Sequence, residues 1–426
     1  MTITFDPRDP SIRSDPYPIY RQLREQDPIH RSSFGYWVLS RYADVDAVLR
    51  APEASSEFYR NTTWAKRRGG MDSPLVQSVQ NWMLMLDGPA HRRIRGVISK
   101  VFTRSAVEGL RPRIAAEADR LLDAVRDGET DLIHSLALPL PVTVTCELLG
   151  LPITDRDQCR HWTEQVSRVI DPSITAEDTA SMNTAEVEFR EYVTSQLDER
   201  RAAPRDDILS LLAHAEVDGD RLTDHEIIAN VLFLFVAGHE TTVNLIGNGL
   251  LALLRHPDQM RILRAHPELI PGAVDEFARY DAPVQIVSRI LNDQVVLDDV
   301  TLPAEAKVML LFGAASRDPR KYSDPDRLDV TRTGIKTLAF SGGPHYCIGA
   351  ALGKMETAMV LAELLRRYPT IELASDNLVW RPNVSFRGLQ QLQLRLSSTD
   401  ARDRQDAVVG SMAAAGRDAG TGEPGV

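Results

Sequence analysis

The residues best suited to chemistry surround one cysteine, Cys347. The run 340–349 reads Phe-Ser-Gly-Gly-Pro-His-Tyr-Cys-Ile-Gly. Glycine lets the backbone approach a neighbouring group closely, and proline stiffens the turn. A helix expected to begin near Gly349 would point backbone N–H groups and its positive end at the sulfur, which favours a thiolate. The run therefore predicts that Cys347 is a metal ligand, whereas Cys146 and Cys159 are expected to be ordinary buried thiols.

An acid and a hydroxyl stand together inside the longest apolar segment, residues 224–254. Residues 237–242 read Ala-Gly-His-Glu-Thr-Thr, and a glycine inside a helix costs about 1 kcal/mol relative to alanine. The small Gly238 would let another group approach the helix, where Glu240 and Thr241 could deliver protons. The alternative is a core helix with incidental polar residues, but four consecutive polar side chains favour the functional interpretation.

Basic residues cluster earlier in the chain. His91 and Arg95 are four residues apart, so both can face one anion on a helix. The stretch 91–113 contains seven lysines and arginines but a single acid, Glu108, in a protein of net charge −11. It is either an ordinary solvated helix face or a docking surface for an acidic partner.

The cysteine run resembles the haem-binding segment of soluble bacterial cytochromes P450. Phe340, Gly343, His345, Cys347 and Gly349 stand at every fixed position of that pattern. The family's fold is mainly α with small β-sheets. The resemblance implies that haem b lies between the long central helix and the helix that follows the cysteine loop, with Cys347 on the iron.

Two further motifs agree with this resemblance. Residues 237–242 are similar to the family's Gly-x-acid-Thr-Thr segment, which makes Glu240 and Thr241 the expected catalytic residues. Glu276 and Arg279 form an ExxR pair, a motif that is common by itself. The resemblance joins this pair to Arg332 in a buried structural triad behind the haem.

The resemblance also assigns residues to the cofactor and the substrate. His91, Arg95, Arg289 and His345 are expected to hold the haem propionates. The full cofactor-binding set is His91, Arg95, Ala237, Gly238, Arg289, Phe340, Gly343, His345, Cys347 and Gly349. The expected substrate pocket comprises Met83, Met85, Phe235, Val236, Val284, Gln285, Ile286, Val287 and Phe386, with Gln285 as a polar orienting group.

The implied activity is that of a monooxygenase. One oxygen atom of O2 would enter a lipophilic small molecule by hydroxylation or epoxidation, in bacterial secondary metabolism such as macrolide or polyketide tailoring. Electrons would come from NAD(P)H through an external ferredoxin and ferredoxin reductase. The alternatives are a peroxide-driven or coupling enzyme, or a haem sensor, and the Glu240–Thr241 pair favours the monooxygenase.

The elements that must position these residues are mainly helical. Apolar residues at three- and four-residue spacing predict helices over 20–26, 114–125, 187–200, 224–254 and 350–368. Thr223 and Glu226 form a capping box at the start of the long helix. A strand is expected at 36–39 and another at 391–396, while 295–297 and 307–311 are expected to share a small sheet. Residues 51–80 are expected to form a long mobile loop.

Composition limits the classes of protein that remain. The chain has 426 residues and a net charge of −11, which argues against a general nucleic-acid binder because such proteins need a basic surface. Three cysteines without a CxxC pair suit a reducing compartment. No signal peptide and no apolar span of about 20 residues is recognised. A cytoplasmic monomer without a membrane partner is expected, with one catalytic domain over 1–397 and a disordered tail over 398–426.

Overall fold

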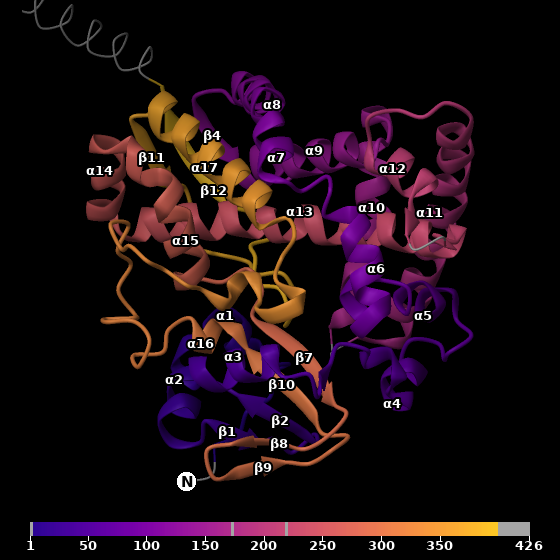
Figure 1. The fold of residues 1–426 in the computed structure, drawn as a ribbon. Helices are drawn as coiled ribbons and strands as arrows, with labels where there is room; N and C mark the ends of the chain where they lie inside the picture. The colour runs from indigo at the N-terminus through magenta and orange to yellow at the C-terminus, as the bar shows by residue number, and fades with distance from the viewer. Residues whose placement is uncertain (1–2, 172–173, 218–219, 399–426) are drawn as a thin grey trace, which may run out of the picture.

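A computed structural model describes residues 3–171, 174–217 and 220–398. Figure 1 shows a helical body that one long helix, α13 (Asp224–Arg255), crosses from side to side, with a smaller sheet-containing part below it. The predicted class, mainly α with small sheets, is confirmed. The predicted disordered tail lies outside the described residues apart from Ser398.

The predicted helices are found, most of them longer than expected. The helices are α1 Pro10–Ser14, α2 Tyr17–Gln26, α3 Tyr42–Arg50, α4 Thr62–Lys66, α5 Pro74–Val79, α6 Gly88–Ile98, α7 Arg104–Gly109, α8 Arg111–Ala124, α9 Pro139–Leu149, α10 Arg156–Ser167, α11 Ala176–Ala202, α12 Ile208–His214, α13, α14 Pro257–Ala265, α15 Ile270–Tyr280, α16 Phe312–Ala315 and α17 Ala350–Arg367.

The strands are short and belong to several small sheets. They are β1 Ile29–Arg31, β2 Tyr36–Leu39, β3 Ala54–Ser55, β4 Gly128–Asp131, β5 Glu216–Val217, β6 Asp220–Arg221, β7 Ile286–Leu291, β8 Val295–Leu297, β9 Val300–Leu302, β10 Lys307–Leu311, β11 Thr370–Leu373 and β12 Gln393–Ser397. The largest sheet has the order β1-β2-β10-β7-β3, and a second has the order β11-β12-β4.

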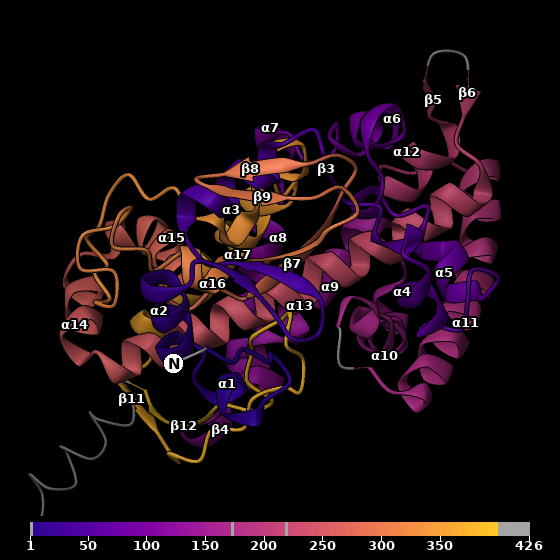
Figure 2. The same ribbon diagram turned by 90° about the horizontal axis from the view of Figure 1, so that it is seen from below.

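The central helix α13 begins at the predicted capping box. The Thr223 hydroxyl accepts the Glu226 N–H at 3.3 Å, and the Glu226 carboxylate accepts the Thr223 N–H at 2.8 Å. Its side chains are buried on nearly every face because α9, α10, α11, α15 and α17 pack around it (Figures 1 and 2). Among the described residues α13 is the one helix long and apolar enough to cross a membrane, and 78% of that apolar window is buried inside the protein.

Strand β7 carries Arg289 into the centre of the largest sheet. β7 is antiparallel to β10, and the register places Val308 opposite Arg289. The predicted pairing of 295–297 with 307–311 is wrong. Instead β8 pairs with β9 in a hairpin, because the two residues between them form a tight turn in which Asp298 has φ 47°.

The prediction of a long mobile loop over 51–80 is also wrong. This segment contains β3, α4, α5 and a 3-10 turn at Phe58–Arg60. Asn61 caps α4 and Ser73 caps α5 through their side-chain oxygens. Trp64, Leu75 and other apolar side chains of the segment are buried, so its few hydrophobic residues are enough to fix it against the core.

Candidate functional site

A cavity of about 450 Å³ lies between α13, the cysteine loop and β7. This volume is in the range of small-molecule binding sites. Many of the predicted residues border it, namely Met83, Met85, His91, Arg95, Ala237, Gly238, Thr241, Val284, Ile286, Val287, Arg289, Phe340, His345, Cys347, Gly349 and Phe386. The fold thus brings together residues from six separate parts of the sequence.

The thiol of Cys347 faces this cavity. Cys347 is exposed and its side chain borders the cavity, whereas Cys146 and Cys159 are buried as predicted. Burial raises the pKa of the Cys347 thiol, and a hydrogen bond from the Gly349 N–H with the charge of Arg95 lowers it. The Cys347 N–H in turn donates to the Phe340 carbonyl at 2.9 Å. The donors that favour a thiolate are therefore in place, and a bound cation would complete its stabilisation.

Gly343 serves the loop in a different way from the prediction. It has φ 61° and does not border the cavity. A Cβ at this position would lie 2.4 Å from the carbonyl oxygen of Leu49. Glycine is thus required where the loop packs against the end of α3, and its expected contact with the cofactor stays a prediction.

Cationic side chains gather beside the cysteine loop. The rings of His91 and His345 lie 4.4 Å apart, and His345 Nε2 is 3.1 Å from Asp87 Oδ1. Burial, together with the neighbouring His345 and Arg95, lowers the pKa of His91 to about 4. Burial also lowers the pKa of Arg289 to about 10, while Asp87 opposes this shift. The positive charge of this cluster at neutral pH therefore rests mainly on Arg95 and Arg289. The carboxylate of Asp87 does not balance both, so the cluster is suited to binding an anion.

These donors fit haem b. Within the described residues, His91 Nε2 is buried without a hydrogen-bond partner, and Arg289 donates from Nη1 to the carbonyl of its neighbour Ser288. Buried polar groups of this kind ordinarily have a partner, and carboxylates bind arginine strongly. Two propionates would satisfy these donors, and Cys347 offers the sulfur ligand that a haem iron accepts.

Thr241 lies on the cavity face of α13. Its hydroxyl donates to the Ala237 carbonyl at 2.9 Å, and the Thr242 hydroxyl donates to the Gly238 carbonyl at 3.1 Å. Gly238 borders the cavity on one side, while a Cβ there would lie 3.0 Å from the Thr145 hydroxyl of α9. Glycine at this position therefore allows close packing of α9 as well as access from the cavity.

Glu240 does not border the cavity, although it was predicted beside Thr241 as a catalytic residue. Its side chain is buried next to Ser167, at the end of α10. Burial raises the pKa of its carboxyl group. Successive residues of a helix point about 100° apart, so the acid and the hydroxyl face different neighbours.

Three residues predicted for the substrate pocket lie elsewhere. Phe235 is fully buried with its ring against Phe189 and His239, and neither it nor Val236 borders the cavity. The neighbouring Phe233 and Leu234 do, since they share a helix face with residues 237, 238 and 241.

The third misplaced residue, Gln285, points to the opposite side of its segment. Its amide donates to the Ala282 carbonyl at 2.7 Å, and its Oε1 packs against Gly313. Val284 and Ile286 face the cavity, as expected when side chains alternate along an extended chain.

The Glu276, Arg279 and Arg332 side chains meet in the core. Arg279 donates to both carboxylate oxygens of Glu276, at 2.6 and 2.7 Å, and both residues are fully buried. Arg332 approaches the same carboxylate at 3.2 Å. Arg279 also donates to carbonyls of the 316–327 segment, so the cluster fastens α15 to the chain that leads into the cysteine loop.

Two acids of the site were not predicted. Glu356 of α17 borders the cavity and is 2% exposed, and burial raises its pKa to about 8. Asp87 accepts hydrogen bonds from the Ser55 hydroxyl and the Ser56 N–H, at 2.6 and 2.9 Å. Glu356 could have been recognised as a buried acid, because it falls on the apolar face of the predicted helix 350–368. The contacts of Asp87 depend on tertiary structure and leave no such pattern.

Comparisons with known proteins agree on one family. The family model described as Cytochrome P450 matches residues 175–383. Cytochrome P450 107B1 of Saccharopolyspora erythraea is 40% identical over 402 residues, which cover 91% of this chain and 96% of that protein. The cytochrome P450 monooxygenase PikC of Streptomyces venezuelae is 39% identical, with 90% of this chain and 91% of that protein covered.

Solved structures give the same result. The crystal structure of CalO2 superposes with a TM-score of 0.88 at 36% identity, covering 93% of this chain and 99% of that one. The structure of PksS from Bacillus subtilis, named as a bacillaene polyketide synthase cytochrome P450, has a TM-score of 0.84 at 34% identity, covering 93% and 100%.

Proposed function

This chain belongs to the cytochrome P450 family and is a haem-dependent monooxygenase, and we propose that its substrates are lipophilic molecules of bacterial secondary metabolism. One oxygen atom of O2 enters the substrate by hydroxylation or epoxidation. The observation that carries the proposal is the Cys347 thiol at the wall of a 450 Å³ cavity whose other walls are largely apolar. Polyketide or macrolide tailoring is favoured because PksS is named for polyketide biosynthesis and the related TamI structure is tirandamycin C-bound.

The cofactor is held by residues that already border the cavity. Cys347 would ligate the iron of a bound haem, Arg95 and Arg289 would neutralise its propionates, and His91 and His345 would hydrogen-bond to them. When bound, the haem supplies the oxygen-activating chemistry, which the thiolate promotes by donating electron density. The protein orients the ring and excludes bulk water, and the Gly349 N–H donates to the sulfur and partly offsets the rise in its pKa that burial causes.

Protons reach the reacting oxygen from α13. Thr241 presents its hydroxyl to the cavity while donating to the Ala237 carbonyl. Glu240 stores a proton on the other side of the helix, because burial favours its neutral form. A hydroxyl on one face and an acid one residue away can pass a proton without opening the cavity to solvent.

The buried triad keeps this arrangement rigid. Glu276, Arg279 and Arg332 join α15 to the segment before the cysteine loop. Because the loop follows that segment directly, the position of Cys347 depends on the triad.

Electrons come from NAD(P)H through a ferredoxin and its reductase. In the stretch 91–113, Arg93 pairs with Glu226 and Arg111 pairs with Glu108. The exposed residues Arg92, Lys100, Arg104 and Arg113 have no ion-pair partner among the described residues; we call these four the basic surface. Arg95, in the same helix as Arg92, donates to the carbonyl of Tyr346 next to Cys347, so this surface adjoins the cysteine loop and suits an acidic ferredoxin.

The same proposal covers the state of the protein in the cell. The chain acts as a cytoplasmic monomer with one catalytic domain over 1–397. The burial of α13 inside the protein, the solubility expected from a net charge of −11 and the similarity to bacterial relatives support this.

The test is the absorption spectrum of the reduced protein under carbon monoxide. Wild type should show a Soret band shifted strongly to the red, and the Cys347→Ala variant should lose that shift while still binding haem. A folded wild type without the shift would contradict thiolate ligation. A panel of macrolactones, steroids and fatty acids, titrated while the spectrum is followed, then tests the substrate class, and binding of fatty acids alone would overturn the polyketide assignment.

A further inference from the structure

After Glu240 has given up a proton, it must regain one from a side of α13 other than the side that faces the main cavity. Its carboxyl lies on the face of α13 that the cavity does not reach. Oε2 is buried and has no hydrogen-bond partner within the described residues, and the nearby Ser167 hydroxyl donates to the Glu164 carbonyl at 2.9 Å. An unpartnered buried carboxyl oxygen is costly unless ordered water serves it.

Asn244 extends this polar face by one helical turn. It is 1% exposed, and neither atom of its amide has a hydrogen-bond partner in the part of the chain that is described. Residues four apart on a helix have Cβ atoms roughly 5–6 Å apart, a span that one water molecule can bridge. The amide lies directly against Gly388, where a Cβ would come within 1.8 Å of Asn244 Oδ1. Asn244 is thus held between Glu240 and the chain around Gly388.

The segment around Gly388 also holds Arg381. The Arg381 N–H donates to the Gly388 carbonyl at 2.9 Å, and its Nε donates to the Leu389 carbonyl at 3.3 Å. Burial raises the pKa of Glu240, and the charge of Arg381 is the main influence that lowers it. The hydrogen bonds of Arg381 to the Gly388 and Leu389 carbonyls, and the contact of Gly388 with Asn244, place Arg381 at the same face of α13.

A small cavity of about 20 Å³ borders Arg381 and Gly388. A cavity of at least roughly 10–15 Å³ can hold one water molecule if two or more polar groups border it. Gln285 also borders it, and Gln285 Oε1 is buried without a partner among the described residues. Because Trp380 and Arg381 in its wall are half-exposed, the cavity lies near the protein surface.

We propose that Arg381 and Asn244 form a proton inlet to Glu240, in which water between the small cavity and Asn244 relays protons from solvent. Both are positioning residues, since they order the water and orient the carboxyl group without touching the reacting oxygen. Each proton that Glu240 passes to Thr241 is replaced by one from solvent, so the protein is unchanged after a turnover. The inlet rests on the proposed role of Glu240 in proton delivery.

The test measures dioxygen consumption by the haem-loaded enzyme in H2O and in D2O. Excess ferredoxin and reductase supply electrons, and myristic acid serves as the probe ligand. Every turnover consumes protons, whether it ends in product or in peroxide, so the solvent isotope effect reports their delivery. We expect Arg381→Met and Asn244→Leu to slow consumption by about three- to tenfold and to enlarge the isotope effect.

Matched variants separate the inlet from a structural effect. Arg381→Lys should recover most of the rate, and Arg395→Met, which removes an exposed arginine from β12, should match wild type. Adding Arg381→Met to Glu240→Gln should cause no further loss, because both changes interrupt one path. Asn244→Ala, which removes the amide without adding bulk beside Gly388, replaces Asn244→Leu if the latter loses its carbon monoxide spectrum.

Two results would overturn different statements. Wild-type rates and isotope effects in Arg381→Met and Asn244→Leu, together with a slow Glu240→Gln, would reject the inlet and leave the role of Glu240 intact. A Glu240→Gln enzyme that behaves as wild type would reject the proposed role of Glu240 itself.

Discussion

Glu356 is a carboxyl group that the fold keeps neutral inside the cavity wall. It is 2% exposed, and burial raises its pKa from an ordinary 4.5 to about 8. Its helix also carries Gly353, where a Cβ would lie 3.2 Å from the Thr242 hydroxyl. A neutral acid therefore lies within one helical turn of the contact between α17 and Thr242 of α13.

This burial makes the stability of the protein depend on pH. Between pH 4.5 and about 8 the folded state binds a proton at Glu356 that the unfolded state has lost. The free energy of unfolding therefore falls as pH rises through this window, by at most about 1.4 kcal/mol per pH unit from this group. Glu356→Gln should remove that part of the slope and stabilise the protein at pH 8. Denaturant unfolding of the haem-loaded protein at pH 6, 7 and 8 measures the difference.

Glu363 of the same helix is the matched control. It is paired with Arg366, a hydrogen bond that lowers its pKa, so it stays ionised in both states across pH 6–8. Glu363→Gln should leave the slope unchanged. An unchanged slope in Glu356→Gln would show that the buried carboxyl is not the titrating group.

Single residues could be predicted from the sequence when their chemistry was distinctive. A cysteine among glycines, a histidine two residues before it and an acid–hydroxyl pair are visible in the letters. The packing of Gly343 against Leu49 and of Gln285 against Gly313 could not be predicted, because these partners are far away in the sequence. Asp87 was missed for the same reason.

At the scale of elements, the Glu276 cluster fastens α15 to the segment before the cysteine loop. Arg279 and Glu276 are fully buried, and Arg332 is largely so. Removing one partner of such a group leaves an uncompensated buried charge. The elements on both sides would then lose their common attachment.

Arg279→Met should accordingly lower the free energy of unfolding by about 3–5 kcal/mol. Haem retention should fall as well, because the cysteine loop follows the released segment. Guanidinium titration followed by the Soret band measures both effects. Arg366→Met removes an exposed arginine paired with Glu363 and should cost less than about 1 kcal/mol; equal losses in the two variants would contradict the structural role of the triad.

Helices could be predicted where the apolar periodicity extended over many residues and the capping residues could be recognised. The capping box placed the start of α13 correctly, but a helix that is apolar on every face gave no signal for its rotation. Phe235 and Val236 were therefore chosen for the pocket in place of Phe233 and Leu234. The prediction for residues 51–80 failed for another reason. The helices α4 and α5 are too short to show periodicity, and they are fixed by capping residues and by buried side chains such as Trp64.

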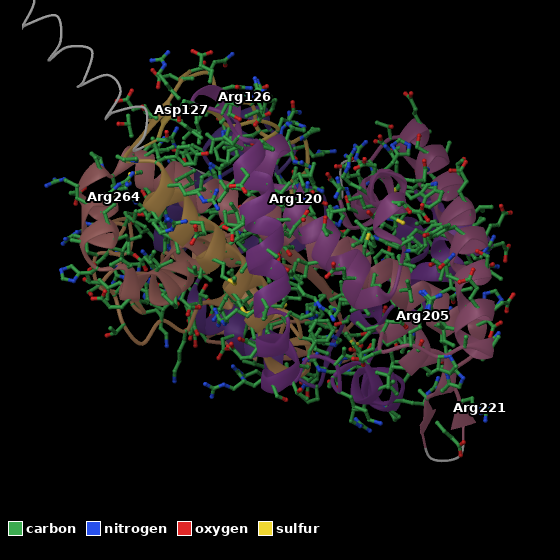
Figure 3. All side chains as sticks on the ribbon, turned by 90° about the horizontal axis from the view of Figure 1, so that it is seen from above. Arg120, Arg126, Asp127, Arg205, Arg221 and Arg264 are labelled. Carbon is green, nitrogen blue, oxygen red and sulfur yellow. The ribbon has the colours of Figure 1, made fainter. Side chains whose placement is uncertain are left out.

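At the scale of the whole molecule, charge is distributed unevenly. The protein has a net charge of −11, yet the basic surface lies on α6, α7 and α8 next to the cysteine loop. Figure 3 labels Arg120 on α8 and, well apart from it, Arg221 on the projecting β5–β6 hairpin. Arg120 is paired with Glu117 and is not part of the basic surface.

Reversing the charge at Arg92 and Arg104 together should slow electron transfer from an acidic ferredoxin by about tenfold at low salt. The difference should shrink at high salt, where the screening length is about 3–4 Å. Stopped-flow reduction of the haem at increasing salt measures both. Arg221→Glu is the control on the distant hairpin; if it slows reduction as much as the double variant, a general charge effect and not docking would be responsible.

The placement of the three cysteines has a practical consequence for handling the protein. Cys347 opens into the cavity, while Cys146 and Cys159 are sealed in the core. A bulky thiol reagent applied to the folded chain therefore has one accessible target, and iron ligation would shield it. The fraction of molecules alkylated at Cys347 would then equal the fraction that lacks the cofactor. Alkylation therefore measures the occupancy of the cofactor site in any preparation, and it needs neither an absorption spectrum nor an activity assay.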